Sequence, residues 1–126
     1  MASEKSGWSE RELLFNISEI FAAANPEVLV GIGDDAAILA RPQNHIVVTT
    51  DMAVEDVHFK VNWSSAEEIG RKIAAANLAD IFAMGGKPKY LTVAMSATGN
   101  EEFEWMLGIA RGIAHEAQIV GAQVIG

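Results

Sequence analysis

The chain has 126 residues, of which 50% are hydrophobic and 21% charged, a composition that fits one compact globular domain and excludes disordered and fibrous classes. Its formal net charge of -8 disfavours nucleic acid and acidic membrane surfaces as partners, and the absence of cysteine excludes disulfides and fits a reducing cytoplasmic compartment. No apolar run approaches the roughly 20 residues of a membrane span, and the polar start over 1–7 lacks the apolar core of a signal peptide.

The first half of the chain is expected to begin with a helix and continue with strands. Ser9 and Glu12 form a capping box, and apolar residues follow at helical spacing until Asn25 and Pro26 stop the pattern. β-Branched residues and turn formers predict strands after this point. In chain order the expected elements are a helix over 10–24, a strand over 28–32, an apolar stretch over 36–39, a turn over 41–44 and a strand over 45–50.

The second half is expected to alternate between helix and strand. Residues 52–63 suggest only an extended stretch at 57–59. Ser65 and Glu68 form a second capping box, and Asn100 is a suitable N-cap for a third helix. The expected elements are a helix from 66 to the glycine pair at 85–86, a strand over 90–97, a helix from 101 to at least 117 and a strand beginning at 124–125.

The strand expected at 90–97 has apolar or small side chains on both faces. One layer of helices covers only one face of a sheet, and large apolar patches are rarely left exposed. We therefore expect the second face to meet another chain or a further domain, and we expect a dimer. The chain also stops at Gly126 within an apolar, strand-like run, so we expect the natural protein to continue beyond it.

Acidic residues stand at three places where chemistry is plausible. Asp34 and Asp35 follow Gly33, where a hairpin turn is the simpler interpretation, and Asp51 equally suits the end of a strand. Asp80 has Ala, Ile, Phe and Met as neighbours, so its carboxylate should be paired, hydrogen-bonded or bound to a cation. Carboxylates that converge repel one another unless a cation lies between them, and Mg²⁺ prefers oxygen ligands.

The remaining polar candidates are weaker. His58 suits either a ligand contact or a half-buried structural histidine, and zinc is improbable because three histidines are scattered and cysteine is absent. Lys60, Lys87 and Lys89 are candidates for phosphate contacts, although exposed lysines usually only solvate a surface. Neither a Walker P-loop nor a kinase-type glycine-rich loop occurs, so any ATP site must be built differently.

Three segments together resemble the amino-terminal domain of thiamine-monophosphate kinases. They are GIGDDAA at 31–37, TTDMAVEDVHF at 49–59 and NLADIFAMG at 77–85, in the order and spacing of that family. The first and third resemble the wider superfamily of aminoimidazole ribonucleotide synthetase, selenophosphate synthetase and a hydrogenase-maturation protein. The second resembles the thiamine kinases in particular. The resemblance covers the chain from about residue 10 to its end.

The resemblance implies an α+β fold in which a mixed four-stranded sheet carries helices on one face and pairs through the other face in a homodimer. Residues 1–126 would form a single ATP- and Mg²⁺-binding amino-terminal domain, and the family's carboxy-terminal domain lies outside this chain. The implied substrates are ATP and thiamine monophosphate, with thiamine diphosphate as product and no covalent catalyst. The implied metal ligands are Asp34, Thr49, Thr50, Asp51 and Asp80, of which 49–51 also hold the ATP phosphates, while His58 contacts thiamine monophosphate and Asp35 is a less certain ligand.

The chain departs from the family at a few positions. Asp56 stands where glycine is more frequent, Ala79 where serine is common and Gly86 where alanine is usual. None of these replaces an implied ligand. Two alternatives to the thiamine kinase remain open at this point: another ATP-dependent synthetase or maturation protein of the same superfamily, or a dimerisation module without activity of its own.

Overall fold

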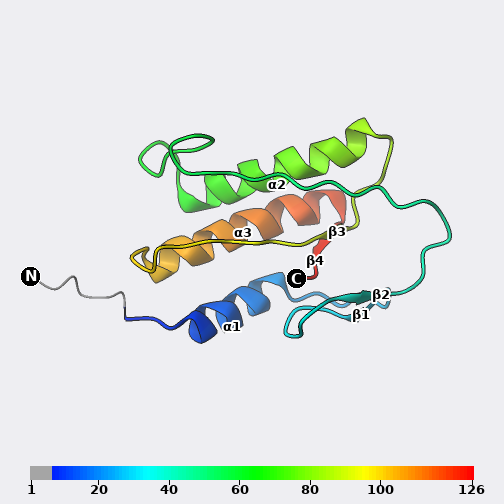
Figure 1. The fold of residues 1–126 in the computed structure, drawn as a ribbon, viewed down its shortest axis with the longest axis horizontal. Coiled ribbons are helices and arrows are strands. Elements are labelled where there is room, and N and C mark those ends of the chain that lie inside the picture. Colours follow the sequence, from blue (N-terminus) through cyan, green and yellow to red (C-terminus); the bar gives the residue numbers. More distant parts are fainter. Residues whose placement is uncertain (1–6) are drawn as a thin grey trace, which may run out of the picture.

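The computed structural model describes residues 7–126, so the start of the chain, where we expect no targeting segment, lies mostly outside the described residues. Helices and short strands alternate, which confirms a mixed α+β class (Figure 1). The elements are α1 (Glu10–Phe21), β1 (Val28–Val30), β2 (Ile38–Leu39), α2 (Ala66–Ala83), β3 (Tyr90–Leu91), α3 (Phe103–Val120) and β4 (Gln123–Val124). Within residues 7–126 no helix has the length and apolar character needed to cross a membrane.

Helix α1 starts at the predicted cap and stops earlier than predicted. The Ser9 hydroxyl accepts a hydrogen bond from the Glu12 backbone N–H at 3.2 Å. Leu13, Ile17 and Phe21 are buried on one face, which is the helical spacing the sequence indicated. The helix ends at Phe21 because the alanines over 22–24 are exposed, and continuing it would bury no further apolar surface.

Helices α2 and α3 form the main packing unit and cross closely. Ile69, Ala74 and Leu78 of α2 are buried against a nearly continuous buried face of α3. The contact depends on glycines, since a Cβ at Gly70 would lie only 2.1 Å from the Ile109 carbonyl oxygen. Two ion pairs flank the crossing, Arg71 with Glu116 at 2.7 Å and Arg111 with Glu67 at 3.2 Å. The position of α2, which carries one wall of the site, is thus set by α3.

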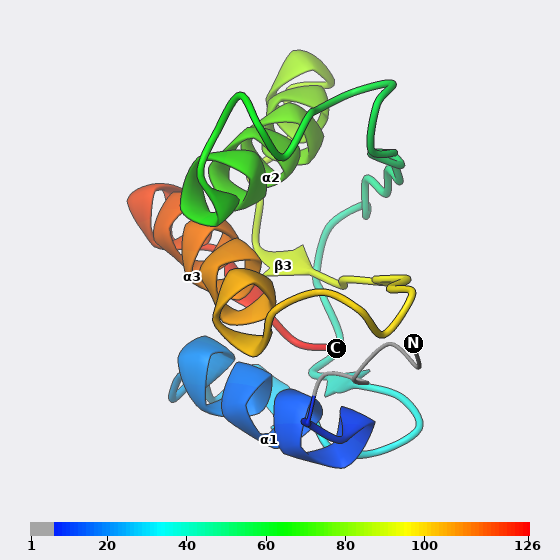
Figure 2. The same cartoon turned by 90° about the vertical axis from the view of Figure 1, so that its left-hand side faces the viewer.

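Strand pairing is split between two small sheets. β1 pairs antiparallel with β2, and β3 pairs parallel with β4. The backbone pairing of β3 with β4 extends two residues past these strands, because the Val93 N–H donates to the Gly126 carbonyl at 2.9 Å. Seen along the helices in Figure 2, the three helices lie together on one side, and the strands and extended segments lie on the other.

The predicted four-stranded sheet is not confirmed. The segment 45–50 forms no strand within the described residues, although it passes close to the turn after α2, where the Val47 side chain lies 3.7 Å from a Cβ built at Gly86. The predicted strand over 90–97 is paired only near its start. A strand needs hydrogen-bonded neighbours along its length, and within residues 7–126 no backbone hydrogen bond pairs 45–50 or 94–97 with another segment.

The N-cap of helix α3 lies two residues later than predicted. Its N-cap is Glu102, which makes no side-chain cap bond, rather than Asn100. The neighbouring Glu101 carboxylate instead accepts the backbone N–H groups of Thr98 and Gly99, each at 3.0 Å. The hydrogen bond from the Thr98 backbone N–H is the main reason why the pKa of Glu101 lies below its ordinary value. The other end is as expected, with Gly121 in the left-handed region at φ 71°.

Candidate functional site

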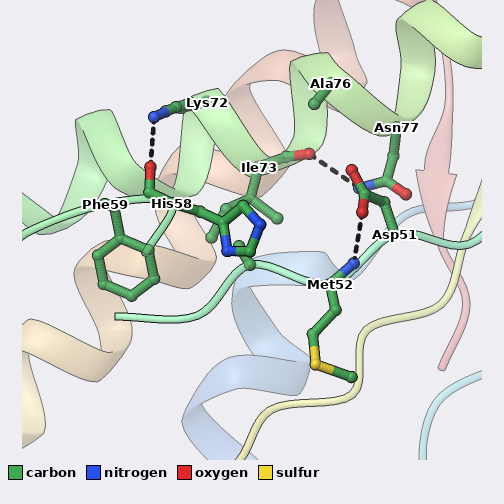
Figure 3. Close-up of a pocket in the computed structure, with 9 residues that line it drawn as sticks. Asp51, Met52, His58, Phe59, Lys72, Ile73, Ala76 and Asn77 are labelled. Atoms are coloured by element: carbon green, nitrogen blue, oxygen red, sulfur yellow. Dashed lines mark hydrogen bonds between the residues drawn. The ribbon is translucent and has the colours of Figure 1, made fainter. Parts of the chain in front are cut away.

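A pocket of about 140 Å³ lies between α2 and the segment that precedes it (Figure 3). Its walls are Asp51, Met52, Ala53, His58 and Phe59 from the segment, and Lys72, Ile73, Ala76 and Asn77 from α2. The α2 residues follow helical spacing and therefore share one face of that helix. The opposite wall belongs to the TTDMAVEDVHF segment, so the most specific part of the sequence resemblance lines this pocket.

The wall opposite α2 is a compact turn closed by its own hydrogen bonds. The Val54 carbonyl accepts the backbone N–H groups of Val57 at 3.2 Å and His58 at 2.8 Å, and the Asp56 N–H donates to the Phe59 carbonyl at 2.7 Å. Asp56 has a φ of 63°, in the left-handed region that favours glycine. The turn therefore explains why the resembling family more often has glycine at this position.

The His58 ring is oriented from within the same turn. Its Nδ1 accepts the Val54 backbone N–H at 3.0 Å. A neutral histidine that accepts at Nδ1 carries its proton on Nε2, so Nε2–H is the group left to donate to a ligand. His58 is exposed, and the structural alternative of a half-buried packing histidine is not supported.

Two contacts hold the turn against the core and α2. The Phe59 side chain is partly buried and packs on the hydrophobic core. The Lys72 ammonium group donates to the backbone carbonyl oxygen of His58 at 2.5 Å, a bond that is drawn in Figure 3. No sequence pattern singles out Lys72, because a lysine on a helix face is ordinarily solvated.

A second pocket of about 250 Å³ adjoins the first around the start of α2 and shares His58, Phe59 and Lys72 with it. Its further lining includes Trp63, whose ring lies 4.8 Å from the Lys60 ammonium group in a cation–π contact. The helix start beside it is fixed by the predicted capping box, in which Glu68 accepts the Ser65 N–H at 2.7 Å. That backbone hydrogen bond lowers the pKa of Glu68.

The predicted metal ligands occupy several places. Asp51 lines the first pocket, where one carboxylate oxygen accepts the Met52 N–H at 2.8 Å. Asp34 lies in the exposed loop between β1 and β2, with a similar bond to the Asp35 N–H at 2.8 Å. Thr49 is half-buried and Thr50 exposed in the unpaired segment before Asp51. None of these residues is in a regular element, so local structure alone does not fix them.

Asp80 differs from the expectation drawn from its neighbours. It lies on α2 one turn after Asn77, but its side chain is exposed and has no hydrogen bond or ion pair within residues 7–126. The apolar residues around it in the sequence face other directions, because only every third or fourth position of a helix shares a face. Asn77 donates to the Ile73 carbonyl at 3.0 Å on the pocket side.

The expected convergence of carboxylates is not present in the described part of one chain. Residues 7–126 contain no group of three acidic or histidine side chains placed to hold a metal ion. Asp51 and His58 are brought into one pocket, while Asp34 and Asp80 are not among its lining residues. The oxygen ligands that the sequence offers are of the kind that Mg²⁺ takes, and Mg²⁺ is commonly held by one or two carboxylates with phosphates and water supplying the rest.

The fold and this pocket define a protein class. Residues 33–126 match the family described as AIR synthase related protein, N-terminal domain, and the chain belongs to that family. Within it, the chain is similar to thiamine-monophosphate kinases, which confirms the resemblance seen in the sequence.

The similarity is substantial and covers part of each relative. The thiamine-monophosphate kinase of Corynebacterium glutamicum is 43% identical over 96 residues, which are 75% of this chain and 29% of that protein. The kinase of Bacillus subtilis (strain 168) is 40% identical over 98 residues, 77% of this chain and 30% of that protein. The crystal structure of thiamine-monophosphate kinase from Stenotrophomonas maltophilia K279a matches with a TM-score of 0.74 and 34% identity, covering 90% of this chain and 35% of that one. The chain thus spans about a third of the length of these relatives.

Proposed function

We propose that this chain is the amino-terminal part of an enzyme that phosphorylates thiamine monophosphate with ATP to give thiamine diphosphate. The observation that carries the proposal is the pocket in which Asp51 and His58, from the segment resembling thiamine kinases in particular, face α2. Family membership supports the use of ATP, and the relatives named thiamine-monophosphate kinase support the acceptor.

The reaction moves one phosphoryl group. The bond between the γ-phosphorus of ATP and its bridging oxygen breaks, and a phosphate oxygen of thiamine monophosphate bonds to that phosphorus, leaving ADP and thiamine diphosphate. Such transfers need positioning and charge neutralisation more than a covalent catalyst. In this proposal His58 offers its Nε2–H to the acceptor, and Asp51 with Thr49 and Thr50 lies at the nucleotide phosphates.

The proposal includes Mg²⁺ as a bound ion. Asp34, Thr49, Thr50, Asp51 and Asp80 are its candidate ligands, and their carboxylate and hydroxyl oxygens suit this ion. When bound, Mg²⁺ neutralises phosphate charge, which an acidic chain with a net charge of -8 needs in order to accept an anionic nucleotide. Thr50 and Asp51 are exposed and Thr49 is half-buried, so the Asp51 carboxylate can reach phosphates without being buried.

The proposal also includes a homodimer with a completed sheet, acting in the cytoplasm. Pockets of about 140 and 250 Å³ are small beside typical ligand sites of roughly 300–1,000 Å³, so further walls are needed around a nucleotide or a thiamine phosphate. A surface for a second copy is supplied by the unpaired backbone at 45–50 and 94–97 and by exposed apolar side chains on the first of these segments. The absence of cysteine is consistent with the cytoplasmic location in this proposal, because a reducing compartment does not support disulfides.

The acceptor is tested with the enzyme that carries this sequence at the length of its relatives. Incubation with ATP, Mg²⁺ and thiamine monophosphate should yield thiamine diphosphate, identified by chromatography and mass. Thiamine and aminoimidazole ribonucleotide precursors serve as comparison acceptors. Turnover of another acceptor without any thiamine diphosphate would favour a different synthetase or maturation protein of the superfamily, and an inactive full-length protein would favour a dimerisation module.

The role of Asp51 is tested in the same enzyme. Asp51→Asn should lower Mg²⁺-dependent turnover by on the order of a hundredfold or more, because a charge that faces the transferring phosphates is lost. Glu19→Gln on α1 is the matched control, since Glu19 is exposed and its side chain has no partner within residues 7–126. Turnover of the Asp51 variant within a few-fold of the parent would refute this role.

A further inference from the structure

We propose that Lys72 is a positioning residue for the acceptor site, acting through the backbone carbonyl of His58. The inference rests on the proposed function, because it concerns how that site is held in shape. It goes beyond the candidate residues discussed so far, which are all on the loops or are acidic. It starts from one contact, the Lys72 Nζ to His58 carbonyl bond of 2.5 Å, which joins residues 14 positions apart (Figure 3).

The contact lies where the two pockets meet. His58, Phe59 and Lys72 line both of them, so the bond between Lys72 and His58 forms part of the wall that the pockets share. Among the described residues that line the first pocket, Lys72 is the only lysine or arginine. A hydrogen bond from an ammonium group to a carbonyl is charge-assisted and stronger than one between neutral groups. Lys72 therefore both shapes the pocket and brings positive charge to it.

The helix start determines which partner Lys72 takes. Glu68 lies four residues before Lys72, the spacing at which a glutamate commonly pairs with a helical lysine. The Glu68 Oε2 atom is instead engaged by the backbone N–H of Ser65 at 2.7 Å and by its hydroxyl at 2.9 Å. The capping box thus engages one oxygen of the usual local partner, and the Lys72 ammonium group donates to the His58 carbonyl instead.

The orientation of the turn depends on contacts such as the Lys72 hydrogen bond. Residues 54–59 close on themselves through short backbone bonds, and the Val54 N–H orients the His58 ring at Nδ1. These internal bonds fix the shape of the turn but not its placement over α2. Phe59 anchors one end in the core, and the Lys72 bond adds a second point of attachment at His58 itself. Two points of attachment fix the orientation of the His58 ring. With Phe59 as the single anchor, the turn could rotate about that residue.

The contrast with Lys60 supports a distinct role. Lys60 lies over the Trp63 ring, a neighbour within the same loop, and lines only the second pocket. Its contact connects the loop to itself. The Lys72 contact connects the loop to a helix whose own position is fixed by close packing on α3. Of these two lysine contacts, only that of Lys72 links His58 to a helix.

The test separates positioning from general stability in the full-length enzyme. Lys72→Met keeps the apolar stem and removes the donor, and Lys72→Arg restores a cationic donor. Lys72→Met should raise the KM for thiamine monophosphate about tenfold and leave the KM for ATP within about twofold, because a small displacement of a positioning group costs up to a hundredfold. Lys72→Arg should recover most of the loss. Arg11→Met, which removes an exposed cation on α1 outside both pockets, should match the parent.

A second measurement needs no activity and uses the 126-residue chain. Amide hydrogen exchange at Val54 should become faster in Lys72→Met, because the Val54 N–H is held by the His58 ring, while exchange in α3 should stay unchanged. An unchanged KM for thiamine monophosphate, an equal rise in both KM values, or unchanged exchange at Val54 would each overturn the inference. If the parent enzyme makes no thiamine diphosphate, the proposed function fails, and faster exchange at Val54 would still establish that Lys72 holds the turn.

Discussion

Gly112 of α3 lies directly against the backbone of Glu67 in α2, so that a Cβ at Gly112 would stand 2.1 Å from the Glu67 carbonyl oxygen. The arrangement is reciprocal, because Gly70 of α2 meets the Ile109 carbonyl of α3 at the same distance. Each helix therefore offers a glycine to the other helix's backbone. This contact sets the depth at which α2 lies, and with it the position of the pocket wall formed by Lys72, Ile73, Ala76 and Asn77.

The glycine contact predicts a large stability effect from a small change. Gly112→Ala should lower the free energy of unfolding by up to about 2 kcal/mol, since forcing a methyl group into a filled contact costs about 1–3 kcal/mol and the helix-propensity gain of about 1 kcal/mol offsets part of it. Urea unfolding followed by circular dichroism measures the change. Gly7→Ala is the control, because no atom of the described part of the chain lies within 4 Å of a Cβ there. Equal stability of the two variants would contradict the close contact.

The left-handed backbone at Asp56 predicts a stabilising change. Asp56→Gly should raise the free energy of unfolding by up to about 1 kcal/mol, because glycine adopts a φ of 63° without the steric cost that other residues meet. Asp56→Val should lower it by about 1–2 kcal/mol, since a β-branched residue is least tolerant of this region. Thermal unfolding of the two variants gives the comparison. The prediction is wrong if valine is tolerated as well as glycine.

Local signals in the sequence predicted the helices well. The capping box of Ser65 and Glu68 and the glycine after α3 act within a few residues, so they can be recognised without knowledge of the fold. The failures concern strands. Residues 45–50 have the composition of a strand, but pairing depends on a distant neighbour, and no other part of the described chain forms backbone hydrogen bonds with them.

The same difference between local signals and long-range contacts applies to the candidate site. Asp51 and His58 were predicted from one continuous segment, and they do line one pocket. Lys72 was missed because its role depends on a contact with a backbone carbonyl, which no residue pattern reveals. Asp80 was expected in an apolar environment, but burial follows the helix face rather than the adjacent residues in the sequence, and the side chain is exposed. A spacing argument that included Asn77 and counted back by one turn to Ile73 and Lys72 would have found the pocket wall.

The capping box at α2 predicts a moderate loss when it is broken. Ser65→Ala removes the hydroxyl that accepts the Glu68 N–H at 3.3 Å and should lower the free energy of unfolding by about 1 kcal/mol. Ser64→Ala is a matched control, since the neighbouring serine makes no hydrogen bond within residues 7–126. Denaturant unfolding of both variants measures the two changes in the free energy of unfolding. A loss of the same size at Ser64 would show that the cap is not responsible.

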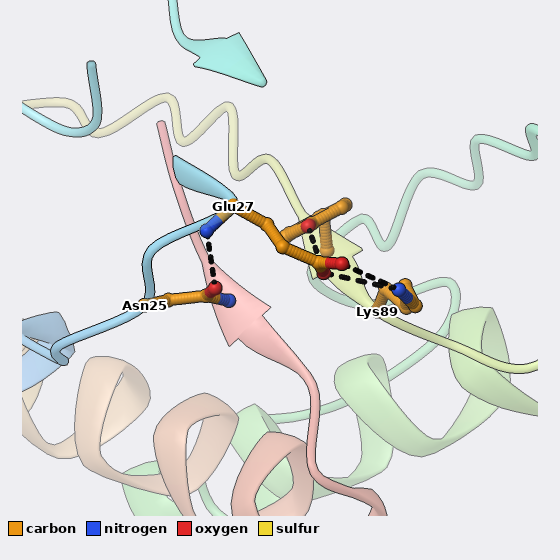
Figure 4. Close-up of polar contacts among 4 residues, drawn as sticks. Asn25, Glu27 and Lys89 are labelled. Atoms are coloured by element: carbon orange, nitrogen blue, oxygen red, sulfur yellow. Dashed lines mark hydrogen bonds and ion pairs between the residues drawn. The ribbon is translucent and has the colours of Figure 1, made fainter. Parts of the chain in front are cut away.

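A contact cluster between the start of β1 and β3 predicts a pH dependence (Figure 4). The Glu27 carboxylate accepts from the Lys89 ammonium group at 3.0 Å and from the Tyr90 hydroxyl at 3.0 Å. The hydrogen bond from Lys89, followed by that from Tyr90, lowers the pKa of Glu27 below its ordinary value of 4.5. A lowered carboxyl pKa contributes stability that is present above the ordinary value and is lost as the pH falls through the folded value.

The test of this cluster is a pair of stability profiles across the acid range. Parent and Glu27→Gln should differ most at neutral pH and converge as the pH falls below 4.5. The difference at neutral pH should be small, because both partners of the ion pair are exposed. Glu19→Gln, which breaks no contact within the described residues, should leave the profile unchanged. A gap between parent and Glu27→Gln that persists at low pH would contradict the assignment.

The exposed apolar segment over 45–50 predicts self-association of the chain. Val48 is 83% exposed although it lies in a run with strand composition, which is the arrangement expected of an edge that pairs with a second copy. Val48→Lys should weaken the dimer about tenfold or more in sedimentation velocity, because pairing would then bury a charge without a partner. Leu14→Lys on α1 is the matched control, since Leu14 is also exposed but lies on a helix away from this segment. If Leu14→Lys dissociates the dimer and Val48→Lys does not, the second copy binds through the helices, and the completed sheet must be abandoned.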